Sequence, residues 1–372
     1  MRIEPFSFCG RLLFGSGVLD KTGELCEELG LKGNAVLVND EITWKLAGEK
    51  ISEALRKHGF RQTRTVNVKR GAVRSEVDKV RTAIRQLNAS VVFGIGGGVN
   101  IDIAKASSFK ENAKCITVPT IFATDAMTTN IATFRPEERG VDEQRHEGDY
   151  HIRVLPVLAC VVDVDIIRDA PWRYQAAGFA DYVSKISAIS DWRLAFSRGK
   201  DPVYSEYAIT LAMSQVEYLV ENAARVRRKE DQAFGAFLQM LVNDGFLMEV
   251  AGNRRIVAGS EHLIAQGLAE EYPTGTSGAL HGEEVGLGTI LMTYLQGGDW
   301  RAVKKALEEV GAPTTGAQLG LNNEGVIRAL VKGRKLNETR MQWFPQFYTI
   351  LMEKDLSREV AGEIAKETGV IK

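Results

Sequence analysis

A cluster of glycines near residue 96 is the part of this sequence whose chemistry is easiest to specify. Gly94, Gly96, Gly97 and Gly98 follow an apolar run over residues 89–93 that is typical of a buried strand, and they precede a helix-like segment over residues 100–109. Glycines let the backbone approach a phosphate closely, and a helix N-terminus offers free N–H groups and a partial positive charge. The pattern predicts a site for the diphosphate of a dinucleotide, and a tight turn that only packs the helix on the strand is the alternative.

Two of the five histidines and one aspartate could supply metal ligands. His262 follows Gly-Ser-Glu, and His281 begins a helix-like segment. Neutral imidazole is the commonest metal ligand, but 19 residues (281 − 262) separate the two, so spacing by itself is a weak signal and capping or core roles stay open. Asp181 is predicted to lie one turn into a helix that begins at Gly178 and to need a partner beside an apolar face. A first-turn aspartate stabilised by the helix dipole is its alternative.

Composition restricts the class of protein that can use these residues. The chain has 372 residues, enough for two domains, and its 47 basic and 48 acidic side chains nearly cancel, so no broad nucleic-acid-binding surface is expected. We expect no signal peptide and no membrane span, because the required apolar stretches are missing. The four cysteines form no C-x-x-C pair, which indicates buried thiols in a reducing compartment, by default the cytoplasm.

Strands and helices alternate over the first half of the chain. Strands are predicted at residues 11–14, 34–39, 62–68, 89–93, 115–119 and 154–164, with helices between the earlier ones, including one over residues 41–58. Such alternation is typical of a parallel sheet covered on both faces, whose ligands lie beyond the carboxyl ends of the strands. The charged segment over residues 135–150 is predicted to be a solvated hairpin tip or loop.

The second half shows only helical periodicity. Helices are predicted at residues 178–197, 204–227, 231–251, 283–295, 300–310 and 324–331. We therefore expect an α/β dinucleotide-binding domain with a parallel sheet over residues 1–165 and an all-α domain over residues 166–372, which would bind metal and substrate. A cleft between such halves is a natural place for an active site.

Several motifs resemble one known group of enzymes. The spacing G-G-G-x-x-x-D-x-A-K over residues 96–105 resembles the iron-containing alcohol dehydrogenase, glycerol dehydrogenase and dehydroquinate synthase superfamily. Residues 178–192, 259–262 and 280–289 resemble its glycerol-1-phosphate dehydrogenase branch, and residues 170–173 and 297–315 add shorter matches. The resemblance implies a dehydroquinate synthase-like fold, a small-molecule substrate, no nucleic-acid partner and a homo-oligomer.

The resemblance also implies ligands for a metal and a cofactor. Asp181, His262 and His281 fall on the metal-ligand positions of the branch, with Zn²⁺ expected and Ni²⁺ or Fe²⁺ as alternatives. Three protein ligands leave an open position at which a carbonyl or hydroxyl is polarised. The cofactor is expected to be NAD(H) or NADP(H). Its implied contacts are Gly96, Gly97, Gly98, Asp102, Thr120 and Thr124, and Asp40, an acid after the second strand, is expected to bind the adenosine ribose, which favours NADH.

Three further residues are implied to contact substrate. Asp125 lies in a segment that resembles P-T-x-x-S/T-x-D and would act on a substrate hydroxyl, although a turn or cap role is the alternative. Lys185 and Arg255 are the other two. Near the end of the chain, residues 344–351 are aromatic where the branch tends to have arginines, so Arg255 is the expected phosphate partner.

These expectations combine into one function. We expect a cytoplasmic, metal-dependent NAD(P)H oxidoreductase that reduces dihydroxyacetone phosphate to sn-glycerol 1-phosphate, with Asp125, Asp181, His262 and His281 at the reacting centre. The alternatives are the same hydride chemistry on another small hydroxyketone or polyol, as in glycerol dehydrogenases, and a cyclase that uses NAD transiently, as dehydroquinate synthases do. A non-enzymatic NAD-binding sensor is the remaining class.

Overall fold

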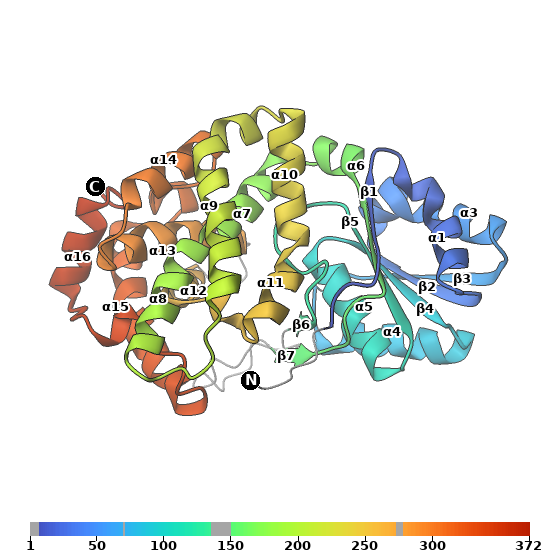
Figure 1. Cartoon of the computed structure of the whole chain (residues 1–372), viewed down its shortest axis with the longest axis horizontal. Coiled ribbons are helices and arrows are strands. Elements are labelled where there is room, and N and C mark those ends of the chain that lie inside the picture. Colours follow the sequence, from blue (N-terminus) through green and yellow to red (C-terminus); the bar gives the residue numbers. More distant parts are fainter. Residues whose placement is uncertain (1–6, 70, 135–149, 273–277) are drawn as a thin grey trace. The chain divides into compact units, whose positions relative to one another are not determined.

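The computed structural model of the chain describes residues 7–69, 71–134, 150–272 and 278–372 (Figure 1). The loop predicted over residues 135–150 therefore lies outside the described residues, except for Tyr150, which begins a strand. The chain divides into two compact units. The first holds residues 1–170 and 242–246, and the second holds residues 171–241 and 247–372. The domain boundary predicted after residue 165 lies within helix α6 (Val164–Asp169), near the end of the first unit.

A six-stranded sheet forms the centre of the first unit. Its strands run in the order β1-β8-β5-β4-β2-β3, and every neighbouring pair is parallel, which confirms the predicted α/β class. The strands are β1 (Leu12–Gly15), β2 (Gly33–Asn39), β3 (Phe60–Asn67), β4 (Val91–Gly96), β5 (Lys114–Pro119) and β8 (Ala159–Asp163). An antiparallel pair, β6 (Ile131–Phe134) with β7 (Tyr150–Arg153), forms a second small sheet that the sequence pattern did not predict.

Both faces of the large sheet are covered, and each face has its own core. Successive side chains of a strand point to opposite faces. Ala35 and Leu37 accordingly pack with α1 (Thr22–Glu28) and α3 (Glu49–Lys57), whereas Val36 and Val38 pack with α4 (Arg74–Leu87) and α5 (Gly98–Lys110). Figure 1 shows these helix pairs on the two sides of the sheet. The continuous apolar runs of the central strands follow from this double burial.

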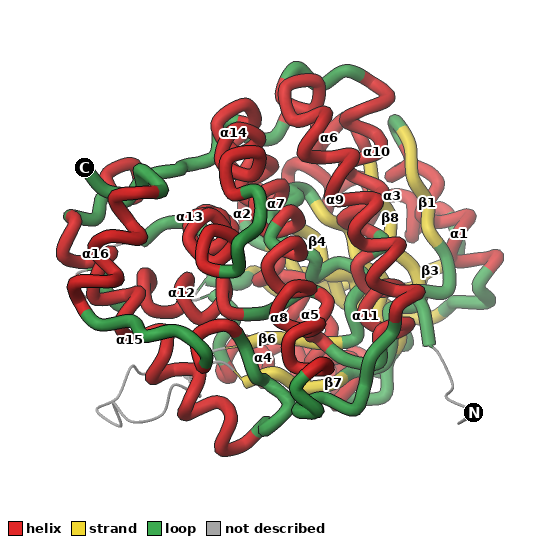
Figure 2. The backbone as a smooth tube through the Cα atoms, turned by 60° about the vertical axis from the view of Figure 1, so that its left-hand side comes forward, coloured by secondary structure: helices red, strands yellow, loops and turns green. Residues whose placement is uncertain are grey.

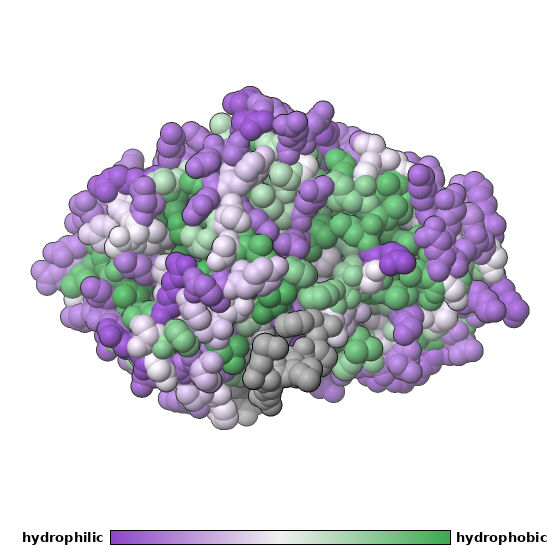
Figure 3. All heavy atoms as spheres, in the orientation of Figure 1, coloured by the Kyte–Doolittle hydropathy of each residue, from purple (hydrophilic) through white to green (hydrophobic). Residues whose placement is uncertain are grey.

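The edge of the sheet at β1 is less completely covered. Leu12 is 48% exposed, and Figure 3 shows apolar side chains reaching the surface beside this strand. Charged and polar side chains dominate the outer helices in the same view.

The single helix predicted over residues 41–58 is interrupted. It consists of α2 (Glu41–Thr43), a π-helical turn η2 (Trp44–Gly48) and α3. The Trp44 ring lies against Gly48, where an added Cβ would approach it to 2.4 Å. Residues 41–58 contain no proline, so the sequence carries no strong helix breaker that would predict this wide turn.

A buried lysine in helix α5 forms hydrogen bonds with the loop that follows β5. The ammonium group of Lys105 donates hydrogen bonds to the carbonyls of Ala126, at 2.7 Å, and Thr129, at 3.2 Å, and also to that of Ile131. It also lies 3.0 Å from Oδ1 of Asp102, whose pKa is raised by burial and lowered in turn by this lysine. The loop between residues 120 and 131 is thus held against the start of α5 by a charged group with no access to solvent.

We expect Lys105→Met to destabilise the first unit by about 3–5 kcal/mol, because it leaves the buried Asp102 carboxylate without its cation. Several carbonyls would also lose their donor. Denaturant unfolding measures the effect. Lys110→Met, an exposed position on the same helix, is the matched control and should change stability by less than about 0.5 kcal/mol. Equal stabilities of the two variants would contradict the assigned role.

The second unit is all-helical over its described residues, as predicted, and Figure 2 shows it as packed helices joined by loops. Two of its helices, α12 and α16, were not predicted, and α15 is much longer than the predicted segment 324–331. The helices of this unit are α7 (Trp172–Val183), α8 (Lys185–Ser197), α9 (Glu206–Arg227), α10 (Asp231–Val242), α12 (Ser260–Ala269), α13 (His281–Leu295), α14 (Trp300–Val310), α15 (Asn323–Trp343) and α16 (Arg358–Glu367), and α11 (Asp244–Ala251) begins in residues of the first unit. In the described part of the chain, no helix combines the length and the apolar character that a membrane crossing requires.

Candidate functional site

The glycine cluster forms the junction between β4 and α5. Strand β4 continues through Gly96, and α5 begins at Gly98 after the cap residue Gly97. Gly94 therefore lies in the strand rather than in the turn. An added Cβ there would approach Cβ of Ala104 to 2.8 Å, so Gly94 allows the helix to pack closely on the sheet. Gly96 has a φ of +139°, a conformation that favours glycine.

The loop after β5 lies against this junction, as the topology predicts. The N–H of Thr120 donates to the carbonyl of Gly96 at 3.1 Å. Oγ1 of Thr124 lies 3.1 Å from the position of a Cβ added to Gly98. Asp125 is half-buried in the same loop. Burial is the main cause of the raised pKa of Asp102, and the nearby charge of Asp125 raises it slightly further. The structure thus brings these four polar residues to the N-terminus of α5, although their individual contacts with a cofactor stay predictions.

Asp40 caps a helix in the structure, and its contact with the adenosine ribose remains a prediction. Its Oδ1 accepts hydrogen bonds from the N–H groups of Ile42 and Thr43, both at 2.9 Å, as the cap of α2. Its Oδ2 accepts from Nδ2 of Asn100 at 3.0 Å, and that amide also donates to the carbonyl of Ile95. Asn100, in the first turn of α5, therefore ties the end of β2 to the glycine junction. No motif in the sequence predicted this role of Asn100.

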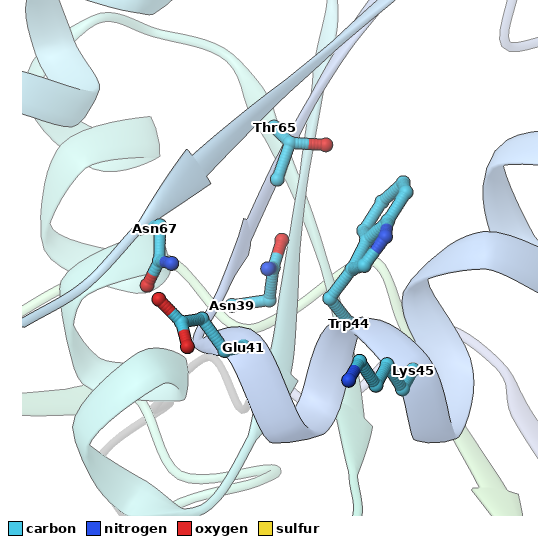
Figure 4. Close-up of a pocket in the computed structure, with 6 residues that line it drawn as sticks. All are labelled: Asn39, Glu41, Trp44, Lys45, Thr65 and Asn67. Carbon is cyan, nitrogen blue, oxygen red and sulfur yellow. The ribbon is translucent and has the colours of Figure 1, made fainter.

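A pocket of about 460 Å³ opens beside the carboxyl ends of β2 and β3. Figure 4 shows the side chains that line it: Asn39, Glu41, Trp44, Lys45, Thr65 and Asn67. The indole of Trp44 offers an aromatic face, Glu41 a carboxylate and Lys45 an ammonium group. The pocket combines a stacking surface with both charges, which suits a nucleoside and its phosphate. The acid that faces this pocket is Glu41, next to the predicted Asp40.

Three ligand-type side chains converge in the second unit. Asp181, His262 and His281 each offer one atom such that these atoms all lie within 4.8 Å of one another. They come from α7, α12 and α13, and α12 and α13 run side by side in Figures 1 and 2. The prediction for the helix around Asp181 was wrong in one respect. Helix α7 begins at Trp172 after Pro171, so Asp181 lies in its last turn, and the first-turn dipole alternative does not apply.

The distances within the cluster suit a shared cation better than hydrogen bonds. Nε2 of His262 lies 3.6 Å from Oδ1 of Asp181, and Nε2 of His281 lies 3.9 Å from it. Both exceed hydrogen-bond length. Two ligand atoms bound tetrahedrally at zinc distances would lie about 3.3–3.4 Å apart. The side chain of His281 is 50% exposed, so the cluster has access to solvent.

A group of buried charges lies behind His262. Burial raises the pKa of Asp191 to about 6 and that of Glu261 to about 7, and the Arg255 guanidinium opposes both shifts. Arg255 is only 3% exposed. It donates from Nη2 to the carbonyl of Tyr348 at 2.8 Å and stacks on Phe347. Its Nε and Nη1 atoms are buried and have no hydrogen-bond partner among the described residues. The phosphate role expected of Arg255 remains a prediction.

Lys185 is also buried, at the start of α8. Its Nζ lies 3.5 Å from the centre of the Tyr182 ring. A role of Lys185 in substrate binding remains a prediction as well. Asp191 and Glu261 were not predicted, although both lie in the motifs 178–192 and 259–262, because the family's metal-ligand positions fall on Asp181, His262 and His281 instead.

The chain is similar to known dehydrogenases. The family model described as iron-containing alcohol dehydrogenase matches residues 13–171. A protein of Methanosphaera stadtmanae named glycerol-1-phosphate dehydrogenase (NAD(P)+) is 33% identical over 358 residues, which covers 96% of each chain. One of Hyperthermus butylicus with the same name is 34% identical over 365 residues, which covers 97% of each chain.

Solved structures agree on the fold. A glycerol dehydrogenase from Schizosaccharomyces pombe superposes with a TM-score of 0.76 at 18% identity, over 99% of this chain and 91% of that one. A probable glycerol dehydrogenase from Sinorhizobium meliloti gives 0.74 at 20% identity, over 98% of both chains. At these identities the likeness shows the architecture, which is the predicted dehydroquinate synthase-like one.

Proposed function

The chain belongs to the glycerol-1-phosphate dehydrogenase branch of the iron-containing alcohol dehydrogenase superfamily, and we propose that it reduces dihydroxyacetone phosphate to sn-glycerol 1-phosphate with NADH or NADPH. The main support for this proposal is that one ligand atom from each of Asp181, His262 and His281 lies within 4.8 Å of the other two. Residues from three helices, up to 100 positions apart (281 − 181), converge there, which a solvated acidic face would not require.

The donor set fits a divalent metal ion, and we propose zinc. Two imidazole nitrogens and one carboxylate oxygen are borderline ligands that zinc binds readily, and three protein ligands are the usual number in catalytic zinc sites. A metal bound there acts as a Lewis acid on a carbonyl oxygen. Asp181 supplies one negative charge to the site, and the half-exposed His281 leaves it accessible to a small ligand.

The first unit is proposed to hold the dinucleotide. The N–H groups at the start of α5, beside Gly97 and Gly98, are suited to its diphosphate. The pocket with Trp44 and Lys45 is suited to the adenosine end, where the indole can stack on a base. The reduced nicotinamide supplies the hydride, so the protein has mainly to orient the reactants.

A substrate screen tests the proposal directly. In metal-loaded protein, kcat/KM for NADH- or NADPH-dependent reduction should be higher for dihydroxyacetone phosphate than for dihydroxyacetone. A charged hydrogen bond to the phosphate is worth roughly 1.5–3 kcal/mol, so we expect a preference of about tenfold to more than a hundredfold. Equal values for the two ketones would contradict the phosphate assignment and favour a glycerol dehydrogenase-like activity.

Asp125 is proposed to orient a hydroxyl of the substrate rather than to bind metal. Asp125→Asn keeps the size of the side chain but loses its charge, so kcat/KM should fall by about tenfold to a hundredfold while metal content and NADH affinity are unchanged. Steady-state kinetics, elemental analysis and calorimetry on the same preparation measure these quantities. A variant that is purified without metal would show that the assigned role is wrong.

A further inference from the structure

A carboxyl group lies within hydrogen-bond distance of the His262 ring. Nδ1 of its ring lies 2.8 Å from Oε1 of Glu261, the preceding residue. We propose that Glu261 is a positioning residue that holds His262 in the tautomer protonated at Nδ1, so that the lone pair of Nε2 faces Asp181 and His281. The inference rests on the proposed metal site, but it concerns a residue outside the ligand set.

The hydrogen-bond partners of one oxygen atom identify this tautomer. Oε1 of Glu261 also accepts a hydrogen bond from the backbone N–H of Gly259, at 2.6 Å. A backbone N–H can only donate, so Oε1 acts as an acceptor and is not the oxygen that would carry a proton. The ring nitrogen that faces the same oxygen must then be the donor. In a neutral imidazole the other nitrogen, Nε2, is left with the lone pair.

The direction of Nε2 agrees with this assignment. It is the nitrogen that lies 3.6 Å from Oδ1 of Asp181, and the ring centre of His281 is 5.2 Å from that of His262. Metal-binding histidines commonly donate their other N–H to a carboxylate, which fixes the ring and raises the basicity of the ligand nitrogen. Glu261 has the geometry for this role, with its Oε1 2.8 Å from Nδ1 of His262.

Glu261 is held rigidly enough to act in this way. Its side chain is fully buried in the first turn of α12. The N–H of Ser260, the neighbouring residue of that turn, donates to Oδ2 of Asp191 at 2.7 Å. A Cβ on Gly259 would approach Oδ2 of Asp191 to 2.7 Å and Oε2 of Glu261 to 2.8 Å, so only glycine leaves room for both carboxyl groups.

The tautomer can be observed before any variant is made. Zinc-free protein with ¹⁵N-labelled histidine is expected to show, in long-range ¹H–¹⁵N correlation spectra at a pH where the ring is neutral, a His262 ring protonated at Nδ1. The resonances of His262 are assigned by their loss in His262→Ala. A wild-type ring protonated at Nε2 would overturn the proposal, whatever the variants do.

Zinc affinity of the metal-free protein, measured by calorimetry with zinc alone, provides the second readout. Glu261→Ala should weaken zinc binding by about tenfold to a hundredfold and shift the tautomer of His262. Glu261→Gln should lose less than tenfold and keep the tautomer, because its amide oxygen can still accept from both N–H groups. Glu270→Gln, at the far end of the same helix where the carboxylate pairs with Lys332, is the control and should bind zinc like the wild type.

The outcomes separate this proposal from the one it rests on. If Glu261→Ala folds and binds zinc with wild-type affinity while His262→Ala does not, the positioning role is overturned and the metal site stands. If His262→Ala and His281→Ala both keep wild-type zinc affinity, the metal site itself is wrong. Should Glu261→Ala fail to fold, the tautomer of His262 in the wild-type spectrum still decides the question.

Discussion

His262→Ala is expected to lose bound metal and turnover together. The purified wild type should carry about one divalent ion per chain, as a single three-ligand catalytic site requires. Removing one of three ligands should empty most of the sites. Because the action of a metal on a carbonyl is worth several kcal/mol, kcat/KM should fall by about a thousandfold or more. Elemental analysis and NADH oxidation on the same preparation measure both losses, and His281→Ala should behave in the same way.

A matched control separates this effect from general damage to the protein. His58, at the end of α3 in the first unit, pairs with Glu27 at 3.0 Å and is not one of the three proposed ligands, which belong to the second unit. His58→Ala should keep its metal and most of its activity. Full activity of the wild type after thorough chelation would show that no metal is needed, and the assignment of the three ligands would then be wrong.

Gly97→Val should abolish most dinucleotide binding while the chain still folds. The variant places a branched side chain beside the N–H groups proposed to hold the diphosphate. Losing one or two charge-assisted hydrogen bonds of roughly 1.5–3 kcal/mol each would lower NADH affinity by about tenfold to more than ten-thousandfold. Gly97 has a φ of −82°, which any residue adopts, and a Cβ there would first meet the end of the Ile121 side chain at 2.9 Å. The backbone therefore tolerates the change.

The control for this variant is Gly235→Val. Gly235 lies in α10, and a Cβ added there would have no neighbour within 4 Å. It should bind NADH like the wild type, and its stability should change only by the small difference in helix propensity, which favours valine over glycine. Calorimetry with NADH compares the two proteins, and unchanged affinity in a folded Gly97→Val protein would remove the diphosphate from this junction.

Local patterns in the sequence were enough to predict the parallel sheet, the glycine junction and the three candidate metal ligands. Alternating apolar runs and helices predicted the parallel sheet, because burial on both faces makes such strands apolar throughout. The glycines at 96–98 predicted the strand–helix junction, because few other sequences allow so close a backbone approach. Resemblance of motifs selected Asp181, His262 and His281, which the structure brings within 4.8 Å of one another. The family was recognisable on the same grounds.

The hydrogen-bond partners of the site residues became apparent only in the folded structure. Asp40 accepts from Asn100, 60 positions away, and Lys105 anchors the loop that carries Asp125. Asp191 joins the N–H of Ser260 to that of Ile350, the latter 159 positions away. Glu261 contacts His262, the next residue in the chain. The tautomer that it imposes on His262 nevertheless depends on where Oε1 of Glu261 lies once α12 is buried. Hydrogen bonds depend on the direction and distance of single atoms, and periodicity and spacing along the chain contain no information about these until the helices are packed.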